Sequence, residues 1–187
     1  MRFLSADFET GGLYPRYHAP ISFALALWDG DTFVEAKEWI FPRFEDLAYT
    51  PKACSINGTE WSAIGVECSE IDLMNSIADW VGSRKATDLP IIAHNAEFDQ
   101  GFYLACVQRT KLDPLLGGWE CTKRRAAVEL PDLKGTSGRK SHSLDSVCAH
   151  FQTNRVGDVH GATEDAILAG IAYIKLKALR DAAKEAS

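Results

Sequence analysis

The sequence predicts an α/β domain built on one mixed β-sheet. Two observations carry this prediction: three strand-like segments follow one another at the start of the chain, and helical segments then alternate with short apolar runs. A length of 187 residues suits a single domain. We expect that domain to cover residues 1–182, and we expect the last residues, 183–187, to form a frayed tail.

The first three strands are expected to form an antiparallel meander. Residues 1–8 read as a buried strand, residues 20–28 as a second strand, and residues 32–41 as a third that returns after a tight Asp-Gly-Asp turn. Residues 42–69 are rich in turn-forming residues, and we expect a loop there.

Helices and short apolar strands are expected to alternate after this loop. Apolar spacing predicts helices over 71–81 and 95–109, and short apolar runs predict strands over 89–93 and 117–121. The side chain of Asn95 is expected to cap the second of these helices.

Helices dominate the rest of the chain. Short helices are predicted over 123–129 and 143–151, with a Gly-rich, basic and mobile segment between them. A long helix is predicted over 162–182, and its apolar stripe is expected to consist of Ile167, Ile171, Ile174 and Ala178.

Charge and cysteine content narrow the class of protein. The net charge of −6 argues against a general electrostatic binder of nucleic acid. Residues 121–155 nevertheless carry seven basic against three acidic residues, which fits either a rim for a phosphate backbone or a solvated loop.

The five cysteines include no CxxC pair, which indicates reduced core thiols in a cytoplasmic protein. Neither a signal peptide nor a long apolar run is apparent, so no membrane contact is expected.

Asp7 and Glu9 form the first candidate site. Two residues apart on a strand, they place both carboxylates on one face, where like charges repel. A solvated acidic edge strand is the ordinary explanation of such a pair. The apolar neighbours Phe3 and Phe8 favour a buried strand instead, and a divalent metal ion between the carboxylates would relieve the repulsion.

Asp99 and Asp165 each lie in the first turn of an expected helix, where the helix dipole favours a carboxylate whatever its function. Asp99 also follows the strand expected over 89–93, and ligands of open α/β sheets usually bind beyond the carboxyl ends of strands. Five helical residues would turn His160 about 140° away from Asp165. The two side chains therefore converge only if His160 lies off the helix; a solvated loop histidine is the alternative.

Three segments resemble the motifs of the DEDDh 3′–5′ exonucleases, the DnaQ-like proofreading family. ADFETGGL at 6–13 resembles the first motif, D-x-E followed by T-G-L, and IIAHNAEFD at 91–99 resembles the second, H-N-x-x-F-D. HGATEDA at 160–166 resembles the third, H-x4-D-A, with Gly161 where the tyrosine branch of the superfamily has its tyrosine. Asn57 stands in a segment where the family often has histidine. Each motif alone is weak, but three in this order are specific.

The resemblance implies an RNase H-like three-layer fold, in which helices flank a mixed sheet of an antiparallel meander followed by parallel strands. It also implies a 3′–5′ exonuclease that releases nucleoside 5′-monophosphates by hydrolysis with two Mg²⁺ or Mn²⁺ ions, which prefer oxygen ligands. The implied metal ligands are Asp7, Glu9, Asp99 and Asp165. His160 is implied as the general base, a task that suits an imidazole near neutral pH.

The resemblance further implies residues that contact the substrate. These are Thr10, Gly11, Leu13, Asn95 and Phe98. Glycine lets main-chain amides approach the terminal nucleotide, and the leucine packs on its base. Phe98 could stack on a base, although core packing is an equally ordinary role for it.

The expected partner is a single-stranded nucleic acid or the 3′ end of a duplex. DNA is favoured and RNA remains an alternative, because discrimination depends on a contact to the 2′ position. An exoribonuclease or oligonucleotide-trimming enzyme of the same family, a polymerase proofreading subunit and a non-catalytic binding module are the rival functions. The filled catalytic positions disfavour the binding module. No docking tail for a polymerase follows the last helix, which favours a stand-alone enzyme.

Overall fold

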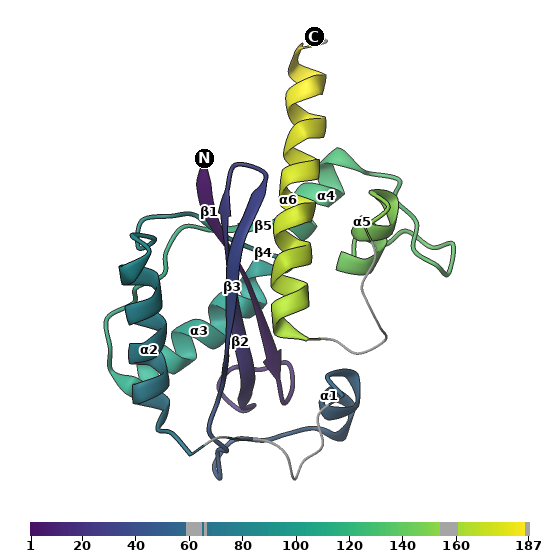
Figure 1. The fold of residues 1–187 in the computed structure, drawn as a ribbon. Coiled ribbons are helices and arrows are strands. Elements are labelled where there is room, and N and C mark those ends of the chain that lie inside the picture. Colours follow the sequence, from purple (N-terminus) through teal and green to yellow (C-terminus); the bar gives the residue numbers. More distant parts are fainter. Residues whose placement is uncertain (59–64, 66, 154–160, 186–187) are drawn as a thin grey trace.

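The computed structural model describes residues 1–58, 65, 67–153 and 161–185, and it is built on a five-stranded mixed sheet (Figure 1). The strands are β1 (Arg2–Thr10), β2 (Pro20–Asp29), β3 (Thr32–Ile40), β4 (Ile91–Ala93) and β5 (Trp119–Cys121). The helices are α1 (Pro51–Ile56), α2 (Glu70–Ser83), α3 (Ala96–Thr110), α4 (Thr122–Glu129), α5 (Leu144–His150) and α6 (Ala162–Glu185).

The sheet has the predicted mixed topology. Its strand order is β3-β2-β1-β4-β5, with antiparallel pairing from β1 to β3 and parallel pairing of β4 with β1 and β5. The parallel pairing of β1 with β4 runs only from Leu4 opposite Ile91 to Ala6 opposite Ala93. The second half of β1 therefore continues past the end of β4.

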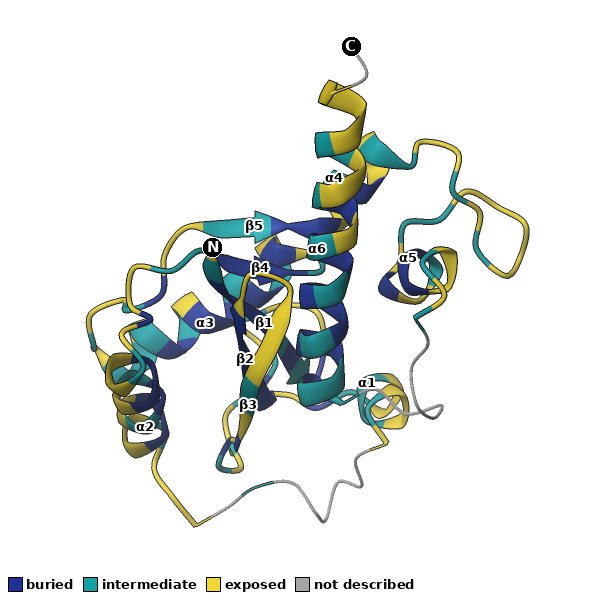
Figure 2. Cartoon of the chain, turned by 45° about the horizontal axis from the view of Figure 1, so that its top comes forward, coloured by how far each residue is buried: buried dark blue, intermediate teal, exposed yellow. Residues whose placement is uncertain are grey.

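Helices cover both faces of the sheet, which gives the three layers (Figures 1 and 2). Alternate residues of β1 point to opposite faces. Leu4, Ala6 and Phe8 pack into the core cluster that includes residues of α2 and α3, whereas Phe3 packs into the cluster beneath α6. Asp7 and Glu9 share the parity of Phe3, so they point toward α6.

The apolar face of α6 differs from the predicted stripe. Ala178 is exposed, and Ile167, Ile171 and Ile174 are only half-buried at the margin of the contact. The buried apolar face consists of Ala162, Ala166, Leu168, Ala169, Ala172, Tyr173 and Leu176. Small residues let a helix approach the sheet closely, and a pattern that weights large apolar residues misses such a face. The helix also continues to Glu185, into the expected tail.

The segment predicted as a loop over 42–69 contains the six-residue helix α1. Thr50 caps this helix by accepting a hydrogen bond from the Ala53 amide at 3.2 Å, and Pro51 opens its first turn. The high content of turn formers concealed a helix too short to show apolar periodicity.

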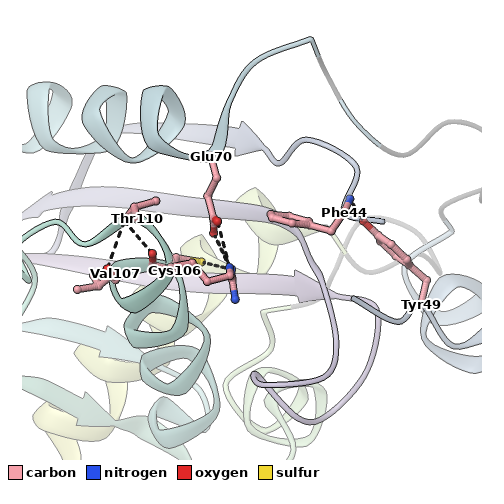
Figure 3. Close-up of polar contacts among 7 residues, drawn as sticks. Phe44, Tyr49, Glu70, Cys106, Val107 and Thr110 are labelled. Atoms are coloured by element: carbon pink, nitrogen blue, oxygen red, sulfur yellow. Dashed lines mark hydrogen bonds and ion pairs between the residues drawn. The ribbon is translucent and has the colours of Figure 1, made fainter. Parts of the chain in front are cut away.

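The chain before α1 contacts α3, and α3 is in turn paired with α2 on the same face of the sheet (Figure 3). The Phe44 amide donates to the Tyr49 hydroxyl at 3.1 Å, and the guanidinium of Arg109 lies 5.3 Å from the centre of the Phe44 ring. Arg109 also pairs with Glu70 at 2.6 Å, which joins the end of α3 to the start of α2. These contacts hold the segment that leads into α1.

The segment predicted to be mobile before α5 folds back on itself. The Gly135 amide donates to the Arg139 carbonyl at 2.9 Å, and the backbones of Lys134 and Lys140 form an isolated antiparallel β-bridge. α4 and α5 pack beside α6 through the cluster that contains Ala126, Val147 and Leu176.

All five cysteines carry free thiols. Cys106, Cys121 and Cys148 are buried as expected, but Cys54 is half-buried and Cys68 is exposed, so the expectation of core thiols was wrong for these two. Among the described helices, none combines the length and apolar character needed to cross a membrane.

Candidate active site

Asp99 completes the edge of β1 where β4 ends. The Leu4 amide donates to the Pro90 carbonyl, but the pairing with β4 is over at Ala6, two residues before Phe8. The Phe8 amide, next along the same edge, donates to Oδ1 of Asp99 at 3.0 Å. A side chain from the first turn of α3 thus takes the place of a strand carbonyl.

The carboxyl of Asp99 is buried among negative charges. Only 2% of this residue is exposed. Burial raises its pKa well above the ordinary value, and the charges of Glu9 and Asp165 raise the pKa further, whereas the Phe8 amide lowers it. Burial is thus the main reason that the charged form of Asp99 is disfavoured, and a bound cation would favour that form.

Asp7, Glu9 and Asp165 form a compact acidic cluster beside Asp99. Each of the three offers a carboxylate oxygen that lies within 4.8 Å of the oxygens of the other two. Asp7 and Glu9 come from β1, and Asp165 comes from the first turn of α6, where it is 5% exposed. A set of carboxylate oxygens suits Mg²⁺ or Mn²⁺, so the residues present fit a divalent metal ion.

The residues of β2 that lie opposite the acidic pair have small side chains. Asp7 lies opposite Ala24 of β2 and Glu9 opposite Ser22, and both of these side chains are small. The pairing of β1 with β2 then shifts register between Glu9 and Thr10. Such irregularities bend a strand and re-aim its side chains, which here separates the acidic pair from the loop that follows.

That loop is held by backbone contacts on both sides. Gly11 donates to the Ala19 carbonyl at 2.8 Å and accepts from the Thr50 amide at 2.7 Å. A Cβ atom at Gly11 would lie 2.6 Å from the Ala48 carbonyl oxygen, so the close approach of this backbone requires glycine. The loop is therefore rigid beside the acidic cluster.

Asn57 joins α1 to the end of β1. Its Nδ2 donates to the Thr10 carbonyl at 3.1 Å. The sequence marked this position as an asparagine in place of the histidine common in the family, but it assigned no contact to it. The structure places Asn57 as a support for the loop.

The residues expected to contact substrate lie in different environments. Thr10 and Gly11 are buried, Leu13 is 71% exposed, and Phe98 is half-buried with its ring 5.0 Å from that of Phe102. This packing favours the core role for Phe98.

Asn95 does not cap α3 as predicted. It adopts a left-handed conformation with φ of 87°, and its side chain makes no capping hydrogen bond. A capping side chain needs an extended backbone at that position, which the left-handed turn between β4 and α3 excludes. His160, the expected general base, lies outside the described residues.

His94 is a half-buried residue to which the sequence assigned no role beyond the second motif. Its Nε2 lies 2.9 Å from the His142 carbonyl, which can only accept, so Nε2 carries the hydrogen. Nδ1 then accepts from the Thr122 hydroxyl at 2.9 Å. Burial is the main cause that lowers the pKa of His94 to about 4. A neutral His94 thus joins the end of β4 to α4 and to the segment before α5.

Part of the basic stretch is engaged inside the protein. Arg124 pairs with Glu97 at the start of α3, and Arg125 pairs with Glu120 at 2.8 Å. Four lysine and arginine side chains of the stretch are exposed without being part of these pairs: Lys123, Lys134, Arg139 and Lys140. Arg155 lies outside the described part of the chain.

Comparisons with known proteins agree with the fold and the motifs. A scan of protein-family models finds no match to this chain. The DNA polymerase III PolC-type of Oceanobacillus iheyensis is 27% identical over 179 residues, which are 93% of this chain and 11% of that protein.

Solved structures of exonuclease I share the fold. Exonuclease I from Methylocaldum szegediense matches with a TM-score of 0.77 at 19% identity, over 95% of this chain and 40% of that one. Exonuclease I of E. coli in complex with a dT13 oligonucleotide matches with a TM-score of 0.78 at 20% identity, over 98% and 42%. The chain therefore spans less than half the length of these proteins. The predicted RNase H-like exonuclease fold is confirmed, and with it the resemblance in fold to DnaQ-like 3′–5′ exonucleases.

Proposed function

We propose that this chain is a DEDDh-type 3′–5′ exonuclease that releases nucleoside 5′-monophosphates from the 3′ ends of DNA. One observation carries the proposal: Asp7, Glu9 and Asp165 meet within 4.8 Å at the end of β1. Asp99, whose pKa is raised by burial and further by the charges of Glu9 and Asp165, supplies the fourth carboxylate of the motif set. Three carboxylates that meet, with a fourth near enough to interact with two of them, fit the metal chemistry that the motifs imply.

The resemblance to the DEDDh exonucleases supplies the role of each side chain. Asp7, Glu9 and Asp165 would hold one Mg²⁺ or Mn²⁺ ion, and Asp7 with Asp99 a second. When bound, two such ions activate the attacking water and stabilise the charge on the leaving oxygen. His160 takes the proton from that water, as the resemblance implies. Asp99 at the same time fixes the Phe8 amide, so the end of β1 keeps its position under the substrate.

DNA is the favoured substrate. The E. coli exonuclease I structure that shares the fold contains a dT13 oligonucleotide, and the curated match is a DNA polymerase. The similarity to a DNA polymerase III also supports a second candidate function, proofreading together with a polymerase. Free thiols at all five cysteines suit a reducing compartment such as the cytoplasm.

The test is a side-by-side digestion of matched oligonucleotides labelled at either end. Single- and double-stranded DNA and RNA are incubated with Mg²⁺, with Mn²⁺ or with EDTA. We expect metal-dependent release of mononucleotides from the 3′ label, fastest on single-stranded DNA. Release only from the 5′ label, or equal release in EDTA, would contradict the proposed activity.

A further inference from the structure

The loop that follows the acidic residues of β1 exposes two aromatic rings. Tyr14 is 62% exposed and Tyr17 is 69% exposed. In the described part of the chain, Phe33 on the edge strand β3 is the one other aromatic residue among the exposed large side chains. An exposed aromatic pair on the loop that continues from the acidic strand points to a binding surface rather than to packing.

The two rings are presented by a rigid turn. The amides of Tyr17 and His18 both donate to the Tyr14 carbonyl at 2.9 Å, and the Tyr14 amide donates to Nδ1 of His18 at 3.1 Å. The Tyr17 carbonyl accepts from the Ala48 amide at 2.8 Å. A surface that is already ordered loses little conformational entropy when a ligand binds to it.

A groove lies on each side of this turn. A groove of about 470 Å³ is lined by Leu13 and Tyr14 on one side and by Lys52 and Ile56 of α1 on the other. A second groove of about 350 Å³ lies between Tyr14, Arg16 and Tyr17 and the α3 residues Gly101 and Gln108. Both volumes fall in the range of about 300–1,000 Å³ that is typical of small-ligand pockets.

The charged side chains that line the two grooves indicate which class of ligand would bind there. The described lining of the first groove has one charged side chain, Lys52, and that of the second has one, Arg16. Both are cationic and exposed, although the chain has a net charge of −6. Aromatic faces together with isolated cations, and with no carboxylate among these lining residues, fit stacked bases on a phosphate backbone.

We infer that residues 13–17 form a stacking surface for the nucleotides of single-stranded DNA that precede the 3′-terminal one. Tyr14 and Tyr17 stack on bases, and Arg16 and Lys52 contact the phosphates. Residues 13–17 begin four residues after Glu9, and the inference places the strand over them when its 3′ end occupies the acidic cluster. The order of the nucleotides rests on the proposed function, whereas binding of the strand does not.

Binding is tested by fluorescence anisotropy with a twelve-nucleotide oligothymidylate in EDTA, where no hydrolysis occurs. The Tyr14→Ala/Tyr17→Ala double variant is expected to raise Kd by about 10- to 100-fold, which corresponds to losing about one or two stacked bases. Tyr14→Phe/Tyr17→Phe keeps both rings and should keep the affinity. Phe33→Ala is the matched control for loss of an exposed ring and should bind like the parent.

A kinetic comparison separates stacking from a mere distortion of the loop. In Mn²⁺, kcat/KM of the alanine double variant should fall about tenfold or more further on the twelve-nucleotide strand than on a dinucleotide, which barely reaches the loop. An equal loss on both lengths would mean that the substitution only displaces Glu9, and that result overturns the inference.

An unchanged Kd of the double variant overturns it as well, because this is the outcome expected if the surface serves a protein partner. Failure of the parent to bind the strand overturns it too. If the parent binds the strand and the variants behave as expected but nothing is hydrolysed, the proposed activity fails and the stacking surface stands.

Discussion

Asp99 combines a structural contact and a charge in one side chain. Its Oδ1 accepts from the Phe8 amide at 3.0 Å, while burial, and then the charges of Glu9 and Asp165, raise its pKa. The unfolded chain ionises this carboxyl with an ordinary pKa. The raised pKa in the folded state therefore lowers the free energy of unfolding at every pH above the ordinary value.

Asp99→Asn separates the two properties, because asparagine keeps an oxygen for the Phe8 amide and removes the charge. We expect the variant to lose nucleotide release but to melt above the parent in EDTA at neutral pH, because it no longer holds a buried charge near Glu9 and Asp165. Asp99→Ala leaves the buried amide without an acceptor and should melt below the parent. Differential scanning fluorimetry measures all three proteins. If asparagine destabilises the protein as much as alanine does, the charge is not a burden on the fold.

The lowered pKa of His94 predicts that the free energy of unfolding falls in mild acid. Its pKa is about 4 in the folded protein, against 6.5 for the unperturbed side chain. Below pH 6.5 the unfolded state takes up a proton that the folded state refuses until about pH 4, so stability falls across this interval as the pH falls. The total is about 3 kcal/mol, since one pKa unit is worth about 1.4 kcal/mol.

The measurement compares urea unfolding of the parent and of His94→Gln between pH 7 and pH 4. Carboxylates contribute to both proteins, so the difference between the two curves isolates His94. We expect the free energy of unfolding of the parent to fall more steeply by up to about 3 kcal/mol over this range. Parallel curves would show that His94 is not the neutral, half-buried group described above.

At the scale of elements, α6 shows what apolar periodicity can and cannot predict. The pattern identified the helix, because isoleucines recur at helical spacing. It misplaced the buried face, because alanines and Gly170 allow the helix to lie close to the sheet. A Cβ atom at Gly170 would lie 2.5 Å from the ring of Trp28, which Ser5 holds through a hydrogen bond of 2.8 Å.

Gly170→Ala tests this close packing. Alanine gains up to about 1 kcal/mol of helix propensity, but the clash with a fixed indole costs about 1–3 kcal/mol, so a net loss of stability is expected. Nucleotide release should fall as well, since the same helix carries Asp165. The control is Gly82→Ala in α2, where a Cβ atom meets nothing within 4 Å and a gain in stability is expected. A pair of variants with equal melting temperatures would refute the close contact.

At the scale of the whole molecule, the order of the elements was predictable and the contacts between distant segments were not. The meander was predicted from three consecutive strand-like segments and a tight turn, and the parallel strands were predicted from apolar runs between helices. The acidic residues came from three motifs, of which the third includes His160. The contact between Phe8 and Asp99 joins residues 91 positions apart, and no local pattern reports it. The aromatic turn at 13–17 was likewise hidden, because exposure depends on the whole fold.

The site depends on that whole fold, because three separate elements supply its carboxylates. β1 brings Asp7 and Glu9, α3 brings Asp99, and α6 brings Asp165. The short β4 is what makes this possible, since its early end lets α3 begin beside β1. A chain with these residues in another topology would have the motifs without the cluster.

The most direct test of the central claim is the rate of nucleotide release from 3′-labelled single-stranded DNA as a function of Mn²⁺ concentration. It is measured for the parent, for Asp7→Asn, and for Asp79→Asn, which neutralises an exposed carboxylate of α2 as a control. We predict saturable metal dependence in the parent and the control, and a rate lower by about a hundredfold or more in folded Asp7→Asn. A parent rate that is unchanged in EDTA, or an Asp7→Asn variant as fast as the parent, would contradict a metal-dependent nuclease site at the end of β1.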